Sequence, residues 1–460
     1  MDRLPDELLA IVLGFVPAAE RIPLRAVSQR WLSVIDATPH FWHEAAAPRL
    51  IAGELRFSSI TGELRRRCGA GSLAKVQWFV SVFGISAVGS GADALCSAAM
   101  GGYLDIAQWL VATLKIAGVG EDTVVRTCAG GHLEVARWLI ATFGITAERA
   151  EHSLCEAAVG GHLPCVEWLA DRFGYGPGVI FSALHEASRG GHLATVQWLV
   201  ARAEAEAPAA TISRGLCDAL CAACGCGHLE VAQLLADRLT RAAGQLLRAA
   251  GLEPLRAACA GGSLEVARWF TDTLGTDTIA AAITAEDRYG ARVSKTILGR
   301  ACTEGHLNIA QWLTSTFRLT KADVPPRILA AVCAEGHLGV AQWLTATFDL
   351  NAADARADTN SALFNSCIRS RFDVARWLIS RFGLTLTDVC GGDDVLLHVA
   401  HGNNREDIFQ FLEEEFGFEF DAAAWEENVI RNRALEHMAD DIDAAAWGAK
   451  WSDEADPYAD

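Results

Sequence analysis

The sequence lacks long apolar runs and has a shortage of positive charge. None of its uninterrupted apolar stretches approaches the roughly 18 residues of a membrane-spanning helix, so we expect no membrane insertion. The start, MDRLPDEL, has neither the basic residues nor the apolar core of a signal peptide, which predicts a cytoplasmic or nuclear protein. Lys and Arg total 39 against 57 Asp and Glu, and no basic stripe occurs, which argues against nucleic-acid binding.

The negative charge is concentrated at the carboxyl end. Residues 401–460 hold 17 acidic and 4 basic side chains, a net charge of -13 out of -18 for the whole chain. We expect residues 417–460 to form an acidic cap or tail, with docking of a basic partner as the alternative. Trp425, Trp447 and Trp451 lie within this segment and either cap the last repeat or form a short binding motif.

What the chain has in abundance is one repeated segment. GGHLEVARWL at residues 130–139 recurs in close copies such as GGHLATVQWL at 190–199 and EGHLGVAQWL at 335–344. Eleven copies follow one another at about 30 to 34 residues, with three longer connections, which is typical of a solenoid of helix pairs. The positions equivalent to the tryptophan are Trp78, Trp109, Trp138, Trp168, Trp198, Leu234, Trp269, Trp312, Trp343, Trp377 and Phe411.

Within a repeat, the pattern predicts two helices and a tight turn. Apolar residues such as Leu133, Val135, Ala136 and Leu139 cover one broad helix face, and the preceding Gly-Gly allows conformations closed to other residues. Gly144 is a predicted helix stop and Thr146 a predicted N-cap of the next helix. The sequence therefore predicts an all-α fold.

Fourteen cysteines occur, and most occupy one repeat position. Cys128 and its equivalents stand ten residues before the tryptophan, where other copies have Ala99, Ala158 or Ser188. A position that accepts Cys, Ala or Ser requires a small side chain where helices approach closely, so we expect reduced, buried thiols. Zinc binding by Cys217, Cys221, Cys224 and Cys226 is a weaker alternative, because three of them share one helix face instead of forming two separated pairs.

Histidines follow the turn glycine in six copies. No carboxylate, serine or second histidine recurs at a fixed offset that would complete a catalytic set, so we predict no catalytic residues, no metal and no cofactor. We expect each histidine to bond backbone groups across the turn and fix the next repeat, and the tryptophans to be structural. The six histidines are His132, His162, His192, His228, His306 and His337.

The repeat resembles the ankyrin repeat. Leu184, His185, Glu186 and Ala187 match the start of that motif, and residues 131–136 match its second helix, GHLEVA. The resemblance covers about residues 60–416 and implies a protein-binding solenoid of about eleven helix-pair repeats. Most copies lack the threonine-proline opening, and their connections look too short for complete β-hairpins.

Residues 1–50 do not follow the repeat and read as three short helices. Alone they are too few to bury their apolar residues, which indicates a partner surface or a cap for the solenoid. They resemble the F-box through its Leu-Pro start, the Glu7-Leu8-Leu9 triplet, the Val27-Ser28-x-Arg30-Trp31 signature and Phe41-Trp42. Arg21 and Pro23 depart from the motif. Residues 51–59 would then be a linker.

The F-box resemblance implies a partner. F-box proteins bind a Skp-family adaptor that links them to a cullin-RING ubiquitin ligase. By position, the contact is implied to involve Leu4, Pro5, Leu8, Leu9, Val12, Val27 and Trp31. An F-box followed by tryptophan-rich ankyrin units also resembles proteins of giant DNA viruses of amoebae. In that case the host cytoplasm or nucleus is the expected location.

The sequence therefore predicts the substrate-recognition subunit of an SCF-type ubiquitin ligase. The alternative is a scaffold that sequesters a partner without the ligase; an enzyme is a distant third. Polar residues vary at one position of the first helix, two before the small residue, and a recognition stripe or a merely solvated face would both show this. The candidate client-binding residues there are Arg66, Arg126, Glu156, Glu186, Arg300 and Asn365.

Overall fold

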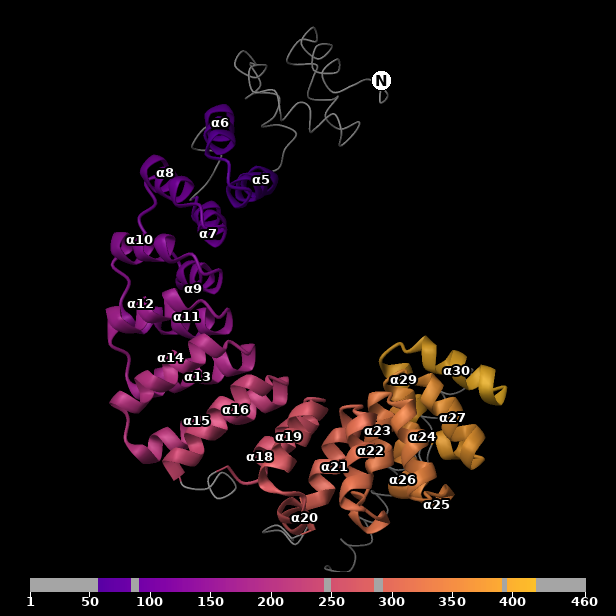
Figure 1. Cartoon of the computed structure of the whole chain (residues 1–460). Helices are drawn as coiled ribbons and strands as arrows, with labels where there is room; N and C mark the ends of the chain where they lie inside the picture. Colours follow the sequence, from indigo (N-terminus) through magenta and orange to yellow (C-terminus); the bar gives the residue numbers. More distant parts are fainter. Residues whose placement is uncertain (1–56, 84–90, 244–249, 285–292, 391–394, 419–460) are drawn as a thin grey trace, which may run out of the picture. The chain divides into compact units, whose positions relative to one another are not determined.

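The computed structural model describes residues 57–83, 91–243, 250–284, 293–390 and 395–418 (Figure 1). These residues form helices and connecting turns and contain no β-strand. They divide into two compact units: unit 1 holds the described residues up to 258 together with 265–274, and unit 2 holds 259–264 together with the described residues from 275 onwards. The all-α repeat fold predicted from the sequence is confirmed.

Each repeat within the described residues begins with a first helix, and eleven of these are present. They are α5 (Phe57–Gly69), α7 (Ala92–Met100), α9 (Glu121–Ala129), α11 (Ala147–Val159), α13 (Pro177–Gly190), α15 (Ala209–Cys226), α18 (Glu253–Ala260), α21 (Val293–Thr303), α23 (Ile328–Glu335), α26 (Ala357–Ile368) and α29 (Val395–Gly402). Their length varies from 8 residues in α18 to 18 in α15.

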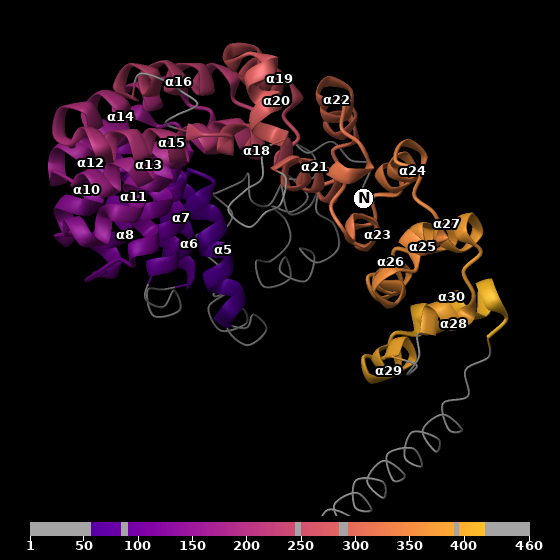
Figure 2. The ribbon, with the colours of Figure 1, turned by 90° about the horizontal axis from the view of Figure 1, so that it is seen from below.

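A second helix follows each of these and carries the tryptophan position. In unit 1, Figures 1 and 2 show the second helices α8, α10, α12 and α14 as one layer beside the first helices α7, α9, α11 and α13. The second helices are α6 (Leu73–Phe83), α8 (Leu104–Leu114), α10 (Leu133–Phe143), α12 (Leu163–Phe173), α14 (Leu193–Glu206), α16 (Leu229–Ala243), α19 (Leu264–Leu274), α22 (Leu307–Phe317), α24 (Leu338–Thr347), α27 (Phe372–Phe382) and α30 (Glu406–Phe416).

Four short helices lie in the connections of unit 2. They are α20 (Thr276–Thr284), η3 (Lys321–Asp323), α25 (Ala352–Ala355) and α28 (Leu386–Cys390). The domain boundaries predicted above stay predictions, and residues 1–50 lie outside the described residues. Within the described part of the chain, no helix is both long and apolar enough to cross a bilayer.

The core lies between the two helix layers and repeats from copy to copy. In one copy, Leu154 and Ala157 of α11 and Val166 and Leu169 of α12 have no exposed surface. The small position is equally closed in ten of the eleven copies, where its residue is 0% exposed, which confirms that close packing requires a small side chain there; the last copy has the half-buried His401 instead. The ten closed residues are Cys68, Ala99, Cys128, Ala158, Ser188, Cys224, Cys259, Cys302, Cys333 and Cys367.

The turn histidines connect successive repeats, as predicted. His162 Nε2 donates to the carbonyl of Ala129 at 2.9 Å, and His192 Nε2 to that of Val159 at 2.7 Å. In each case the acceptor closes the first helix of the preceding repeat, so the ring satisfies a carbonyl that the helix end leaves without an intrahelical partner. His228 and His306 make equivalent bonds to Arg189 and Ala260.

Arginine substitutes for this histidine near the end of the stack. Arg405 Nη1 donates to the carbonyl of Ile368 at 2.8 Å, which is the same repeat position that the histidines reach. The longer side chain thus keeps the inter-repeat hydrogen bond.

The glycine pair of the turn makes room for these rings. Gly161 has φ +70°, and a Cβ there would overlap the ring of His192. A Cβ on Gly160 would approach the ring of His162 and the carbonyl oxygen of Ala129, the latter at 2.9 Å. The second glycine of the turn is therefore needed wherever a ring packs on it, whereas the first is replaced by Glu304 and Glu335 in two copies.

The predicted helix ends are also at the expected residues. Gly144 ends α10 in the left-handed conformation, with φ 62° and ψ 41°. Thr146 is the N-cap residue of α11, but its side chain makes no capping hydrogen bond. The extended backbone of Thr146, not its hydroxyl, is what begins the helix.

The repeat tryptophans with described side chains are half-buried rather than enclosed. Several pack edge-on against the phenylalanine five residues later: Trp138 against Phe143 at 6.3 Å between ring centroids, and Trp343 against Phe348 at 5.7 Å. This T-shaped arrangement is favourable for aromatic rings. The tryptophans therefore seal the outer edge of the core.

Ion pairs join successive connections in unit 2. Lys321 Nζ lies 3.0 Å from Asp354 Oδ2, and Arg356 Nε lies 3.0 Å from Asp388 Oδ1. Asp354 also accepts the amide of Asn351, and this bond, followed by Lys321, lowers its pKa. Asp354 and Asp388 therefore cap the start of α25 and α28 and at the same time pair with a cation of the preceding connection.

We expect acid to weaken unit 2 through Asp407. The hydrogen bond from Arg405 lowers the pKa of Asp407 to about 2, with Ser370 adding to the effect. Because the folded pKa lies below the unfolded value near 3.9, the stabilisation is complete above about pH 4 and is lost as the pH falls towards 2. Asp407→Asn should cost on the order of 1 kcal/mol at pH 7, the pair being exposed and screened, and almost nothing at pH 2.

Thermal unfolding at pH 7 and pH 2 measures this. Glu413→Gln, which removes one charge elsewhere on α30, is the matched control. An equal loss for Asp407→Asn at both pH values would contradict the assignment.

Candidate functional site

The candidate client-binding residues lie on the accessible side of the first helices. A residue two positions before the buried small residue faces away from the core, since two helical steps turn the side chain by about 200°. In unit 1, Arg66, Arg126 and Glu156 are exposed and Glu186 is half-buried. In unit 2, Arg300 is exposed and Asn365 half-buried. Their role in binding stays a prediction.

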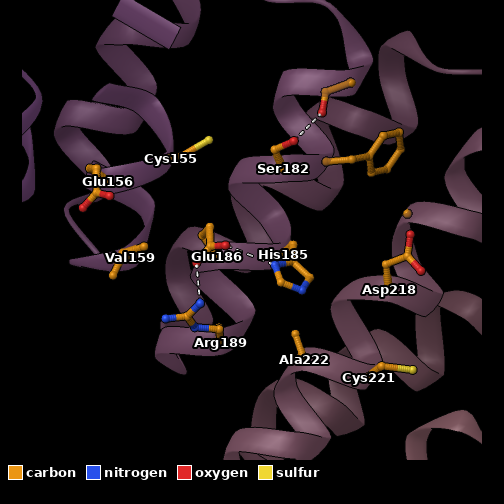
Figure 3. Close-up of a pocket in the computed structure, with 13 residues that line it drawn as sticks. Cys155, Glu156, Val159, Ser182, His185, Glu186, Arg189, Asp218, Cys221 and Ala222 are labelled. Atoms are coloured by element: carbon orange, nitrogen blue, oxygen red, sulfur yellow. Dashed lines mark hydrogen bonds and ion pairs between the residues drawn. The ribbon is translucent and has the colours of Figure 1, made fainter. Parts of the chain in front are cut away.

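The first-helix face of unit 1 is hollowed where three consecutive helices pack side by side. A groove of about 950 Å³ extends across α11, α13 and α15 (Figure 3). Glu156 lines it from α11, Glu186 from α13 and Ala222 from α15, which are equivalent positions of three successive copies. The structure thus brings two of the six candidate residues into one site.

We call this groove the client groove. Its floor is formed where one aromatic ring packs closely on a glycine of the next first helix. The Phe181 ring of α13 lies over Gly215 of α15, where a Cβ would overlap the ring. Gly215 is buried and Phe181 is half-buried, so the ring stays partly accessible from the groove. Glycine at this point of α15 costs helix stability, which packing of Phe181 offsets.

Two thiols extend the uncharged surface. Burial, followed by the nearby carboxylates Glu186, Glu151 and Glu156, raises the pKa of Cys155 to about 11. Burial and Glu253 raise that of Cys221 to about 12. Both therefore stay protonated at neutral pH and present weakly polar surface, not reactive thiolates.

The charged groups of the client groove are mainly acidic. Glu186 Oε1 lies 3.3 Å from His185 Nδ1, and its Oε2 lies 3.6 Å from Arg189 Nη1. Figure 3 shows these three side chains together on α13, with Glu156 on the neighbouring helix to one side and Asp218 on that to the other. Glu156 and Asp218 form no ion pair with any described residue.

This arrangement is suited to binding. The Ser182 hydroxyl donates to the carbonyl of Gly178 at 3.2 Å, within its own helix, and not to His185. Among the described residues, no three His, Cys, Asp or Glu side chains converge to hold a metal ion. The described cysteines of α15 are free, and the pKa of Cys217, Cys221 and Cys224 is raised by burial first of all.

Some residues of the client groove were predicted from the sequence and others were not. The repeat register located Glu156 and Glu186, because both occupy the variable position. Phe181, Arg189 and Asp218 were missed, since none of them occupies it. Gly215 within a helix, opposite an aromatic residue one repeat earlier, is the sequence signal that could have pointed to the groove floor.

The residues predicted to bind the adaptor fall outside the described part of the chain. They are Leu4, Pro5, Leu8, Leu9, Val12, Val27 and Trp31. Their assignment depends on the sequence alone.

Comparison with known families bears on both parts of the chain. An F-box-like family model matches residues 1–46, and a model of ankyrin repeats matches residues 154–243 and 184–282. The chain therefore contains an F-box-like region and ankyrin repeats. No curated protein matches it.

The F-box and ankyrin-repeat match has a direct consequence. Both modules are typically non-catalytic interaction modules, and together they fit a protein-binding adaptor. The ankyrin match begins within α11 and includes α13 and α15, the helices of the client groove. The giant-virus resemblance stays a prediction, because neither match addresses it.

Proposed function

We propose that this F-box and ankyrin-repeat protein is the substrate-recognition subunit of an SCF-type cullin-RING ubiquitin ligase. The observation that carries the proposal is the F-box-like match at residues 1–46, in the same chain as a groove-bearing repeat stack. The F-box binds a Skp-family adaptor, and the first-helix face binds the client protein. The chain contributes proximity and orientation, and the ligase supplies the transfer chemistry.

The adaptor contact is made by one apolar set in the F-box. Leu8, Leu9 and Val12 recur at helical spacing, and Leu4-Pro5 precedes them. Val27 and Trp31 complete the set. The proposal places the chain in the cytoplasm or nucleus, those of a host cell if the chain is viral.

The client contact is made by the variable positions of the first helices. Glu156 and Glu186 within the client groove are the foremost of these. Arg66 and Arg126 extend the recognition stripe on unit 1, and Arg300 and Asn365 carry its equivalent on unit 2. Repeat proteins commonly bind partners through such extended surfaces.

Direct binding of the adaptor tests the proposal. We expect calorimetric titration of the purified full-length protein with a Skp-family adaptor to show a dissociation constant of micromolar or tighter. A folded protein that does not bind would refute the ligase role. It would favour the second candidate, a ligase-independent scaffold that sequesters its partner through the same groove.

A further inference from the structure

The client groove combines an uncharged floor with acidic walls. Phe181 and the protonated thiols of Cys155 and Cys221 form the floor, and Glu156 and Asp218 are exposed on the two outer helices. Such a surface offers an apolar contact at its centre and carboxylates on either side. It is open along its length rather than enclosed (Figure 3).

The balance of charge within the groove is negative. Its lining has three carboxylates, from Glu156, Glu186 and Asp218, against one permanent cation, Arg189. That cation is already engaged with Glu186, at 3.6 Å. The two remaining carboxylates have no ion-pair partner among the described residues.

Carboxylates just beyond the lining make the electrostatic potential in the groove more negative. Glu151 of α11 contributes to the raised pKa of Cys155, and Glu253 of α18 to that of Cys221. Glu253 is paired with Arg256 at 2.9 Å, so its charge is partly compensated. The thiols at the floor therefore lie in a negative potential, one that attracts cations.

We propose that the client groove binds a client segment with two basic side chains flanking one apolar side chain. The inference depends on the proposed role of this face in client binding and specifies the chemistry of the client. The apolar side chain packs on Phe181 between Cys155 and Cys221. The basic side chains pair with Glu156 on α11 and Asp218 on α15. At about 950 Å³ the groove is at the upper end of ligand-site sizes, which suits a short peptide segment.

Arg189 limits the affinity for this segment. Its guanidinium neutralises Glu186 at the centre of the groove and repels an incoming cation. The inter-repeat bond from His228 is made to the backbone carbonyl of Arg189, so the side chain can be exchanged without removing that bond. Arg189→Gln should therefore tighten binding.

A matched set of peptides tests the proposal on the full-length protein. We would measure fluorescence anisotropy of short labelled peptides with centres of Arg-Leu-Arg, Gln-Leu-Gln or Glu-Leu-Glu in a common Gly-Ser background. We expect the basic peptide to bind about tenfold more tightly than the neutral one, with the acidic one weakest. Raising the salt concentration should reduce the difference.

Variants distinguish the groove from the general negative charge of the protein. Glu156→Gln with Asp218→Asn should weaken the basic peptide about tenfold, and Arg189→Gln should tighten it about threefold. The control, Asp237→Asn with Asp272→Asn, removes two exposed charges from the second helices α16 and α19 and should change binding less than twofold. Equal losses in the two double variants would overturn the proposal, as would a neutral peptide that binds as well as the basic one.

The outcome is separable from that of the ligase proposal. Peptide binding without adaptor binding would retain the groove chemistry and refute the ligase. Adaptor binding with no preference for the basic peptide would retain the ligase and refute the groove assignment.

Discussion

Leu8→Asp combined with Pro5→Ala should weaken Skp-family adaptor binding by about 30-fold or more. Leu8 falls on the predicted apolar face of the first F-box helix, and an aspartate there places a charge where an apolar contact is required. Loss of a central interface residue costs about 2–4 kcal/mol, and each 1.4 kcal/mol is a factor of ten. Calorimetric titration of the variant against the same adaptor gives the ratio directly.

The groove variant supplies the matched control for this experiment. Glu156→Gln with Asp218→Asn changes the repeat stack only, so its adaptor affinity should equal that of the wild type. Circular dichroism of each variant establishes that the helices are intact. Retention of adaptor affinity within about threefold by Leu8→Asp, Pro5→Ala would contradict the predicted contact.

Gly161→Ala should lower the free energy of unfolding by roughly 2–3 kcal/mol. A left-handed backbone with a Cβ costs about 1–2 kcal/mol, and displacement of the His192 ring removes a hydrogen bond of about 1 kcal/mol. The substitution lies at the interface between two repeats. It therefore weakens the packing of adjacent repeats, on which the stability of a repeat stack depends. Chemical denaturation with detection of helix content measures the loss.

Gly174→Ala separates the two contributions. Gly174 has φ +60°, but a Cβ there has no atom within 4 Å, so only the backbone cost of about 1–2 kcal/mol applies. His192→Ala should cost less in the Gly161→Ala background than on its own, because Gly161→Ala has already displaced the ring and broken its hydrogen bond. Equal losses for Gly161→Ala and Gly174→Ala would show that the histidine contact contributes nothing.

Repetition is the reason that so much of the fold could be predicted. A small residue such as Cys128 at one fixed position in most copies reveals close helix packing more securely than one occurrence would. The histidine role followed in the same way: His162, His192 and His228 recur beside glycine and lack a recurring catalytic partner. The structure confirms both predictions through closed small positions and backbone acceptors.

Features that differ between copies could not be predicted in the same way. The half-burial of Trp138 and its equivalents depends on how the second helices pack, which apolar periodicity does not specify. The client groove depends on Phe181 covering Gly215, a contact between two copies about 30 residues apart. Register alone located Glu156 and Glu186 but could not show that Asp218 lies across the groove from Glu156.

Sedimentation velocity of three components tests the central claim most directly, namely that one chain joins a ligase adaptor to a client. The full-length protein would be mixed with a Skp-family adaptor and the labelled Arg-Leu-Arg peptide, and the label followed. The account predicts that adaptor addition shifts the peptide signal to a faster-sedimenting complex and that Leu8→Asp, Pro5→Ala abolishes the shift. A peptide signal that stays with the adaptor-free protein, at adaptor concentrations that saturate any micromolar site, would contradict it.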